Sequence, residues 1–129
     1  MERTKYNLDT HILVWIYTGQ SSRIPHKIYK KMEISDLYIS PLVELELQYL
    51  YEIGRLRVSP ENLLQELNDF FDIEVLDTSF SEIIEAAKKV SWTRDAFDRI
   101  IVASSIVEDM PLITADRKIL ANFSESVWD

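Results

Sequence analysis

Cysteine is absent from this chain of 129 residues, and glycine and histidine occur only twice each. The absence of cysteine excludes a disulfide framework, a thiolate nucleophile and a cysteine zinc site. With only Gly19 and Gly54, the chain cannot form a glycine-rich phosphate-binding loop. His11 and His26 lack any ligand spacing such as His-x-x-x-His, which argues against a histidine zinc site. His11 follows Asp9 closely and could reach a site there, but we favour a helix-start or surface role.

Long apolar runs are also absent. The longest candidate, residues 100–107, is too short to span a bilayer and contains two serines. The N-terminus has no signal-peptide pattern, so we expect a cytoplasmic protein with no membrane partner. A hydrophobic content of 47% in a chain of this length predicts a single domain, residues 1–129, with a substantial core.

Acidic residues outnumber basic ones and give a net charge of −8. Such a charge ordinarily argues against a nucleic-acid partner, because binding to nucleic acid depends on Lys and Arg contacts with phosphate. A nucleic-acid partner stays compatible with this charge if several acids form one cluster that divalent cations neutralise. Basic side chains are grouped at Lys27, Lys30 and Lys31, which we interpret as a solvated helix face more readily than as phosphate contacts.

Short apolar strand candidates alternate with helix candidates along the chain. Strands are expected over residues 5–9, 37–40, 73–76 and 112–114 and around residue 127. Helices are expected over residues 10–18, 24–33, up to 53, from 60 onward, 79–90 and 97–107. The inward faces of the fourth and fifth helices are expected to carry Leu63, Leu64, Leu67, Phe70 and Phe71, and Phe80, Ile83, Ile84 and Ala87. This alternation, without repeats or linkers, predicts one α/β domain in which helices flank a mostly parallel central sheet of four to five strands.

Three acidic residues lie where an aliphatic side chain or a plain loop would be expected. Asp9 and Asp116 each follow a short apolar strand candidate, and ligands gather at the carboxyl ends of strands in open parallel sheets. Asp98 lies in the first turn of a helix that is apolar on nearly every face. The helix dipole favours a carboxylate at that position.

Glu46 is a fourth acid in an apolar setting. Its helical neighbours are Leu42, Tyr49, Leu50 and Ile53. It therefore interrupts a face that we expect to be buried. A buried carboxylate is costly unless it is paired, binds a cation or opens onto a cleft. Glu44 points elsewhere on the same helix and is expected to be mostly solvated.

Each acid also has a simpler explanation. Asp9 and Asp116 could cap the helices that follow them, Asp98 could belong to a capping arrangement with Asp95 as N-cap, and Glu46 could pair with an arginine. Caps do not explain why acids recur at strand ends and on an apolar helix face. We therefore interpret the four together as a site for a hard cation, Mg²⁺ or Mn²⁺, for which carboxylates are suitable ligands.

Four segments carry these acids and their neighbours. They are residues 6–15 (YNLDTHILVW), 38–56 (YISPLVELELQYLYEIGRL), 94–103 (RDAFDRIIVA) and 112–117 (LITADR). In this order the segments resemble PIN-domain ribonucleases of the VapC toxin type. Because they extend from residue 6 to residue 117, the resemblance is much more specific than any one motif, and it implies a single PIN-like domain over residues 1–129.

The resemblance implies a metal-dependent endoribonuclease in which Asp9, Glu46, Asp98 and Asp116 are the catalytic residues. These carboxylates would hold one or two Mg²⁺ or Mn²⁺ ions, and water would attack an RNA phosphodiester in line to leave a 5′-phosphate. The family pattern places Glu46 rather than Glu44 at the site, in agreement with the interpretation of the helix faces.

The resemblance also implies supporting residues. Thr10, Asp95 and Thr114 would orient the carboxylates or bound water through hydrogen bonds. Arg99 and Arg117 are weaker candidates for contacts with phosphate or with the neighbouring acids.

Partners are implied as well. Toxins of this kind resemble one another in having a short cognate antitoxin, whose tail occupies the acidic groove, and in forming homodimers. The acidic site suits a basic antitoxin segment on charge alone. The aromatic residues Trp15, Tyr49, Tyr51 and Trp92 could contribute to a dimer interface, although core packing is the more frequent role of such residues.

Two other functions are alternatives. Pro41 and Leu42 replace the small or hydroxyl residues commonly found before the glutamate helix, and strong acidity is unusual for an RNA-cutting domain. These departures favour an inactive PIN-like module that docks a basic protein segment. Binding of that segment would need no metal and would survive Glu46→Gln. A receiver-like phosphoacceptor domain is the other alternative, but it needs two adjacent acids after the first strand, where this chain has Asp9 alone.

Overall fold

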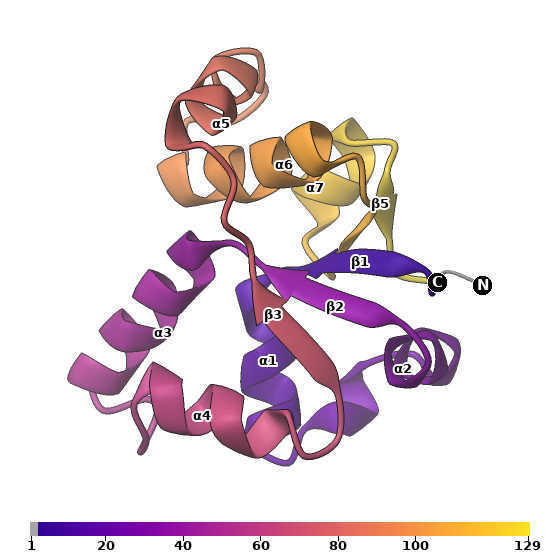
Figure 1. The fold of residues 1–129 in the computed structure, drawn as a ribbon, viewed down its shortest axis with the longest axis vertical. Coiled ribbons are helices and arrows are strands. Elements are labelled where there is room, and N and C mark those ends of the chain that lie inside the picture. The colour runs from indigo at the N-terminus through magenta and orange to yellow at the C-terminus, as the bar shows by residue number, and fades with distance from the viewer. Residues whose placement is uncertain (1–2) are drawn as a thin grey trace.

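A computed structural model of the protein describes residues 3–129 and contains a five-stranded sheet in which every strand is parallel to its neighbours (Figure 1). The strands are β1 (Lys5–Leu8), β2 (Asp36–Ile39), β3 (Asp72–Val75), β4 (Leu112–Ile113) and β5 (Ser126–Val127). Their spatial order is β3-β2-β1-β4-β5. The predicted α/β domain with a parallel sheet is confirmed, and the strands lie within a residue or two of the predicted positions.

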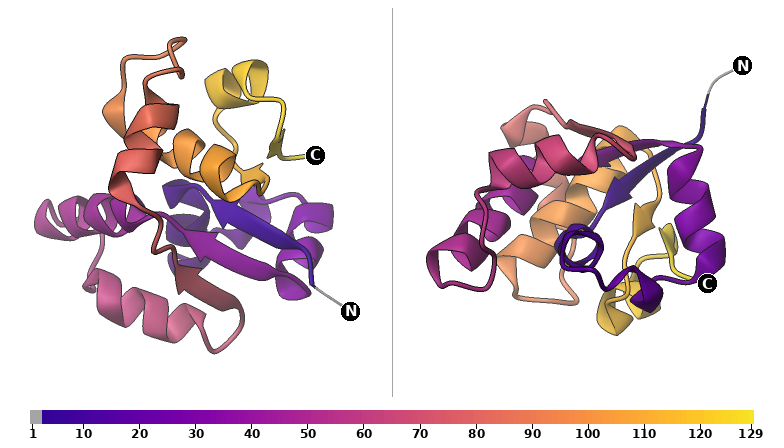
Figure 2. Two further views of the ribbon diagram at one scale, coloured as in Figure 1. Left: turned by 45° about the horizontal axis from the view of Figure 1, so that its top comes forward. Right: turned by 90° about the horizontal axis from the view of Figure 1, so that it is seen from below.

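Helices cover both faces of this sheet. They are α1 (Thr10–Tyr17), α2 (His26–Glu33), α3 (Pro41–Glu52), α4 (Pro60–Leu67), α5 (Phe80–Ala87), α6 (Ala96–Glu108) and α7 (Arg117–Asn122). The first four lie on one face and the last three on the other (Figures 1 and 2). Over residues 3–129, no helix is long and apolar enough to cross a membrane.

The core forms around the central strand β1. Leu8 is fully buried, as are Leu112 and Ile113 on the neighbouring strand β4. Asn7, also fully buried, donates a hydrogen bond from Nδ2 to Ser105 Oγ at 2.9 Å and thereby fastens β1 to α6. The strands that carry the carboxyl-end residues are therefore held rigidly from both faces of the sheet.

Side-chain caps decide where several helices begin. Asp9, Asp95 and Asp116 are the N-caps of α1, α6 and α7, and each accepts hydrogen bonds from backbone N–H groups of the first turn. Ser40 caps α3, and Pro41 follows it at the first helical position, where its missing N–H costs nothing. The capping explanation of these aspartates is thus correct, and Pro41 has a structural reason for its presence.

Three predictions of buried faces are wrong. Phe70 is 75% exposed because α4 ends at Leu67, and Phe80 is 67% exposed because it is the first residue of α5. On α3, the buried residues are Val43 and Leu47. The predicted face around Glu46 therefore lies at the edge of the core, and two of its residues are exposed, Tyr49 and Ile53.

Candidate functional site

The order of the strands in the sheet reverses direction between β1 and β4. Chain segments leave β1 toward β2 and β3 on one side, while β4 and β5 lie on the other side. Asn7 pairs with Leu112 and Leu8 with Ile113, so the next residues, Asp9 and Thr114, emerge side by side at the carboxyl ends. In open parallel sheets, a crevice for ligands forms at such a point.

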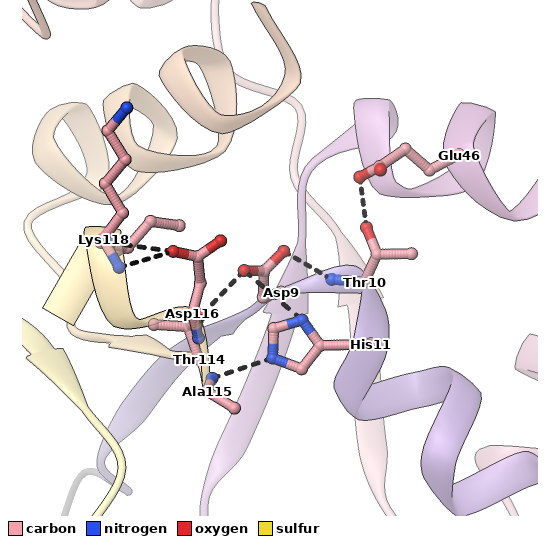
Figure 3. A network of polar contacts seen from close by, with 9 residues as sticks. Asp9, Thr10, His11, Glu46, Thr114, Ala115, Asp116 and Lys118 are labelled. Atoms are coloured by element: carbon pink, nitrogen blue, oxygen red, sulfur yellow. Dashed lines mark hydrogen bonds and ion pairs between the residues drawn. The ribbon is translucent and has the colours of Figure 1, made fainter. Parts of the chain in front are cut away.

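Asp9 is held firmly by its neighbours although it is a charged group. It is only 6% exposed. Oδ1 accepts a hydrogen bond from the backbone N–H of Thr10 at 2.8 Å, and Oδ2 accepts one from Thr114 Oγ1 at 2.8 Å. Thr114 Oγ1 in turn accepts from the backbone N–H of Asp116 at 3.0 Å. The Thr114 hydroxyl therefore connects two of the predicted catalytic acids (Figure 3).

Glu46 approaches the same region from α3. Its Oε1 accepts a hydrogen bond from Thr10 Oγ1 at 2.5 Å. Partial burial raises the pKa of Glu46, and the negative charges of Asp9 and Asp95 raise it further, while the bond from Thr10 acts in the opposite direction. Thr10 thus links Glu46 to the start of α1, as its predicted supporting role requires.

Asp98 occupies the first turn of α6, one turn from the N-cap Asp95. Burial raises the pKa of Asp98 to about 7, and the negative charges of Asp95, Asp116, Asp9 and Glu46 contribute to that rise. Only carboxylates contribute besides burial, so Asp98 lies within the field of the other acids.

Asp116 serves both as a cap and as part of the acidic group. Its Oδ1 accepts hydrogen bonds from the backbone N–H groups of Lys118 and Ile119, at 2.9 and 3.0 Å, at the start of α7. The Lys118 side chain extends away from the carboxylates (Figure 3). A cap of this kind fixes the Asp116 carboxylate in position without neutralising its charge.

One cavity of about 420 Å³ collects all four predicted catalytic acids. It is lined by Asp9, Thr10, His11, Val14, Thr18, Gln20, Glu46, Leu50, Arg55, Leu56, Asp98 and Asp116. These residues come from β1–α1, the loop that follows α1, α3, the α3–α4 loop, α6 and the β4–α7 turn. The fold therefore brings together acids that are as far apart as residues 9 and 116 in the sequence.

The charge in this cavity has little compensation from the protein itself. Among residues 3–129, the ion pairs formed by Lys and Arg involve acids elsewhere, and only His11 lies within 4.0 Å of one of the four carboxylates. The side chains do not converge as a ligand set: within the same residues, no three Asp, Glu or His groups are arranged to hold a metal ion. Asp9, Glu46 and Asp116 instead accept hydrogen bonds from nearby hydroxyls and amides.

This donor set nevertheless fits a hard divalent cation. All four groups are oxygen donors, and their mutual repulsion is relieved by positive charge between them. The backbone positions of Asp9 and Asp116 are fixed by the helix caps and by the pairing of β1 with β4.

His11 is a residue of the cavity that the sequence analysis placed at the helix start or on the surface. Its Nε2 accepts a hydrogen bond from the backbone N–H of Ala115 at 2.8 Å, and its Nδ1 lies 3.8 Å from Asp9 Oδ2. Burial lowers the pKa of His11 more than the charges of Asp9 and Asp116 raise it. The spacing of His11 from Asp9 at a strand-to-helix junction was the signal available in the sequence.

The predicted phosphate contacts are not brought to the cavity. Arg99 donates hydrogen bonds to the carbonyl oxygens of Ala87 and Lys88, at 3.0 to 3.1 Å, and so secures the end of α5. Arg117 is exposed at the start of α7 and does not line the cavity. Arg55 does line it, from the loop after α3.

Thr114→Val is expected to weaken the site without unfolding the protein. Valine keeps the shape of the buried threonine, but the Asp9 carboxylate loses a hydrogen bond and the Asp116 amide loses its acceptor. Loss of such a supporting contact typically reduces metal affinity or activity by about 10- to 100-fold. Titration with Mn²⁺, monitored by melting temperature, would measure the change. Thr78→Val is the control, since Thr78 bonds to Glu108 far from the cavity, and equal affinity in both variants would contradict the role of Thr114.

Comparisons with known proteins agree with this architecture. A family model described as the PIN domain matches residues 6–125. A similar solved structure is VapBC2 from Rickettsia felis bound to a promoter DNA fragment, with 22% identity and a TM-score of 0.66 over 98% of this chain and 100% of that one. A toxin–antitoxin complex from Klebsiella pneumoniae has 19% identity and a TM-score of 0.68 over 95% of each chain. VapBC-1 from nontypeable Haemophilus influenzae has 17% identity and a TM-score of 0.67 over 98% and 97%. No curated protein matches the sequence.

Proposed function

Because this chain belongs to the PIN domain family, we propose that it is a nuclease toxin of the VapC type that hydrolyses RNA with Mg²⁺ or Mn²⁺. The observation that carries the proposal is the cavity in which Asp9, Glu46, Asp98 and Asp116 meet without Lys or Arg partners among the described residues. Uncompensated carboxylates are costly to a fold and are retained where they bind a cation or perform chemistry.

The four carboxylates would together bind the cation. Asp9 and Asp116 provide rigid positions at the sheet edge, and Glu46 and Asp98 approach from α3 and α6. A bound Mg²⁺ or Mn²⁺ supplies Lewis-acid chemistry, polarising the scissile phosphodiester and promoting attack by water. The hydroxyl of Thr10 orients Glu46, and that of Thr114 orients Asp9. Arg55, at the cavity wall, is positioned to contact a neighbouring phosphate of the substrate.

The substrate proposed is RNA, and the place of action is the cytoplasm. A net charge of −8 opposes RNA binding by the metal-free protein. Cations bound among the acids reduce this repulsion where the phosphodiester must approach. Affinity for RNA is therefore expected to depend on the divalent cation as well as on salt.

We further propose a short antitoxin as partner and a homodimer as the assembly. Support for the antitoxin comes from the VapBC complexes among the structural neighbours and from an acidic cavity suited to a basic segment. Support for self-association comes from large apolar side chains exposed on α3 and α5, namely Leu45, Tyr49 and Phe80. Tyr51 is also exposed, whereas Trp15 and Trp92 pack against the core.

Metal dependence gives the direct test of the proposal. Purified protein is incubated with end-labelled total tRNA and ribosomal RNA, with Mg²⁺, with Mn²⁺ or with EDTA. We expect discrete cuts carrying 5′-phosphate ends with either metal and none with EDTA, because the four carboxylates would repel the phosphodiester when no cation lies between them. Mn²⁺ is also expected to raise the melting temperature, since binding to the folded state alone stabilises it.

A binding module that docks a basic protein segment is the second candidate. It is favoured by one observation: within residues 3–129, no three Asp, Glu or His groups converge as a ligand set, and the carboxylates of Asp9, Glu46 and Asp116 accept local hydrogen bonds instead. Absence of cleavage and of any melting-temperature response to Mn²⁺ would contradict the nuclease proposal and favour this module.

A further inference from the structure

We propose that His11 is a positioning residue that holds the turn between β4 and α7, and with it Asp116, against Asp9. The proposal deepens the proposed function, since it concerns the spacing of two acids in the same cavity, and it rests on that function only for its effect on metal binding. The inference follows from what each ring nitrogen faces.

The two nitrogens of His11 face the two strand ends of the site. Nε2 accepts a hydrogen bond from the backbone N–H of Ala115 at 2.8 Å. Nδ1 lies 3.8 Å from Oδ2 of Asp9. Ala115 lies between Thr114 and Asp116, so a bond to its amide fixes the turn that carries both residues. Figure 3 shows the ring inserted between Asp9 and Ala115.

The same contacts select one form of the ring. A nitrogen that accepts from an amide N–H carries no proton, so the neutral imidazole carries its proton on Nδ1. That N–H then faces the carboxylate of Asp9, at a distance that suits an electrostatic contact rather than a short hydrogen bond. The Nδ1–H dipole of His11 is therefore directed toward the Asp9 carboxylate, and Nε2 is joined to the neighbouring turn by a hydrogen bond.

Aromatic packing prevents the ring from leaving this position. The centroids of His11 and Trp15 are 4.9 Å apart, and the Arg23 guanidinium covers the Trp15 ring at 4.1 Å. Trp128 packs against Trp15 at 6.0 Å. The side chain of His11 keeps 28% of its surface exposed toward the cavity. A ring supported from one side and bonded at the other is suited to hold a turn in place.

Replacing His11 by glutamine or by phenylalanine distinguishes the effect of its hydrogen bond with Ala115 from that of its packing against Trp15. Glutamine places Oε1 the same number of bonds from the backbone as Nε2 of histidine, and this oxygen can accept from Ala115. Phenylalanine preserves a ring against Trp15 but accepts no hydrogen bond. A purely structural role for His11 would make phenylalanine the better replacement, whereas the proposed role makes glutamine the better one.

The experiment begins with the wild-type protein free of metal. Nitrogen-15 NMR of the imidazole is expected to show a neutral ring protonated at Nδ1. Hydrogen exchange of the Ala115 amide is then compared among wild type, His11→Gln and His11→Phe. Exchange is expected to be about 10-fold faster in His11→Phe and close to wild type in His11→Gln, as loss of one hydrogen bond implies. Mn²⁺ affinity, measured by the shift in melting temperature, is expected to fall about 10- to 100-fold in His11→Phe and to recover in His11→Gln.

Three results would overturn the proposal. They are a ring protonated at Nε2 in the wild type, an Ala115 amide equally protected in His11→Phe, and equal Mn²⁺ affinity in both variants despite a released amide. The nitrogen spectrum needs no variant, so poor folding of a variant does not leave the proposal undecided. If the wild type neither bound Mn²⁺ nor cut RNA, the proposed function would fail, while the spectrum and the exchange rates would still decide whether His11 holds the turn.

Discussion

Asp98→Asn is expected to reduce RNA cleavage by more than about 100-fold while making the metal-free protein more stable at neutral pH. Loss of a carboxylate that holds the cation should exceed the 10- to 100-fold effect typical of residues that only support such a site. The gain in stability has a separate cause. Burial disfavours ionised Asp98, as do the negative charges of Asp95, Asp116, Asp9 and Glu46, and asparagine carries no charge at this position.

The size of the stability gain follows from the pKa of Asp98, which rises from an ordinary 3.8 to about 7 in the folded protein. A shift of this size corresponds to about 4 kcal/mol, and partial solvation of the side chain reduces it to roughly 2 kcal/mol. Asparagine also loses the favourable contact of a charge with the first turn of α6, worth about 0.3–1 kcal/mol. A net gain of ~1 kcal/mol remains, which raises the melting temperature by about 4 °C.

The pH dependence identifies the cause of this gain. Between about pH 4 and pH 7, folded Asp98 keeps its proton while the unfolded chain releases it. The stability of the wild type therefore falls as pH rises through this range, and the contribution of Asp98 is constant above it. Melting curves of Asp98→Asn and wild type should coincide near pH 4 and separate toward pH 7.

Asp77→Asn makes the same chemical change at an exposed position between β3 and α5. It should change neither cleavage nor melting temperature. An Asp98→Asn protein that is less stable than wild type at pH 7 would show that the carboxylate stabilises the metal-free fold. The unfavourable environment that we describe for ionised Asp98 would then be incorrect.

Glu46→Gln and Glu44→Gln are expected to differ by more than about 100-fold in cleavage although they lie on one helix. Glu46 lines the cavity and accepts a hydrogen bond from Thr10. Glu44 lies outside the cavity lining, where burial and the charge of Glu61 raise its pKa. Glutamine at position 46 can still accept from Thr10 but holds a cation poorly, so the loss should exceed the effect of a supporting residue.

The comparison is made by single-turnover cleavage of the same RNA, with Mn²⁺ titration of melting temperature for each variant. Both variants remove one negative charge from α3, so any general effect of charge on RNA binding cancels between them. Glu44→Gln should keep wild-type cleavage and Mn²⁺ response. Equal activity in the two variants would exclude Glu46 from the chemistry and would require another acid on α3.

Much of the fold was predictable because strands and helices in this chain have strong local signals. Apolar strand candidates, the helix candidates between them and the absence of linkers predicted the parallel α/β domain. Two of the three errors about buried faces occur at helix ends, where periodicity gives no boundary. Phe70 follows the last turn of α4, and Phe80 begins α5. Both remain exposed because an end residue can face away from the sheet even when it fits the helical period.

The sequence predicted which acids lie together, but not which side chains contact backbone groups around them. Asp9 and Asp116 follow strands, and that position alone placed them at one sheet edge. Glu46 was placed correctly, although its helix face is only partly buried. His11 lies at the helix start as expected, but its contact with the Ala115 amide was not predicted. Arg99 contacts the Ala87 carbonyl instead of a phosphate or an acid. Both backbone groups come near these side chains only in the fold.

The distribution of the four acids along the chain also sets the order in which the site is completed during synthesis. A nascent chain acquires β1, β2 and β3, and with them Asp9 and Glu46, well before β4. Asp116 is produced last of the four acids, and it follows β4, which pairs with β1 in the folded protein. A product that terminates before residue 116 therefore lacks one of the four carboxylates that line the cavity.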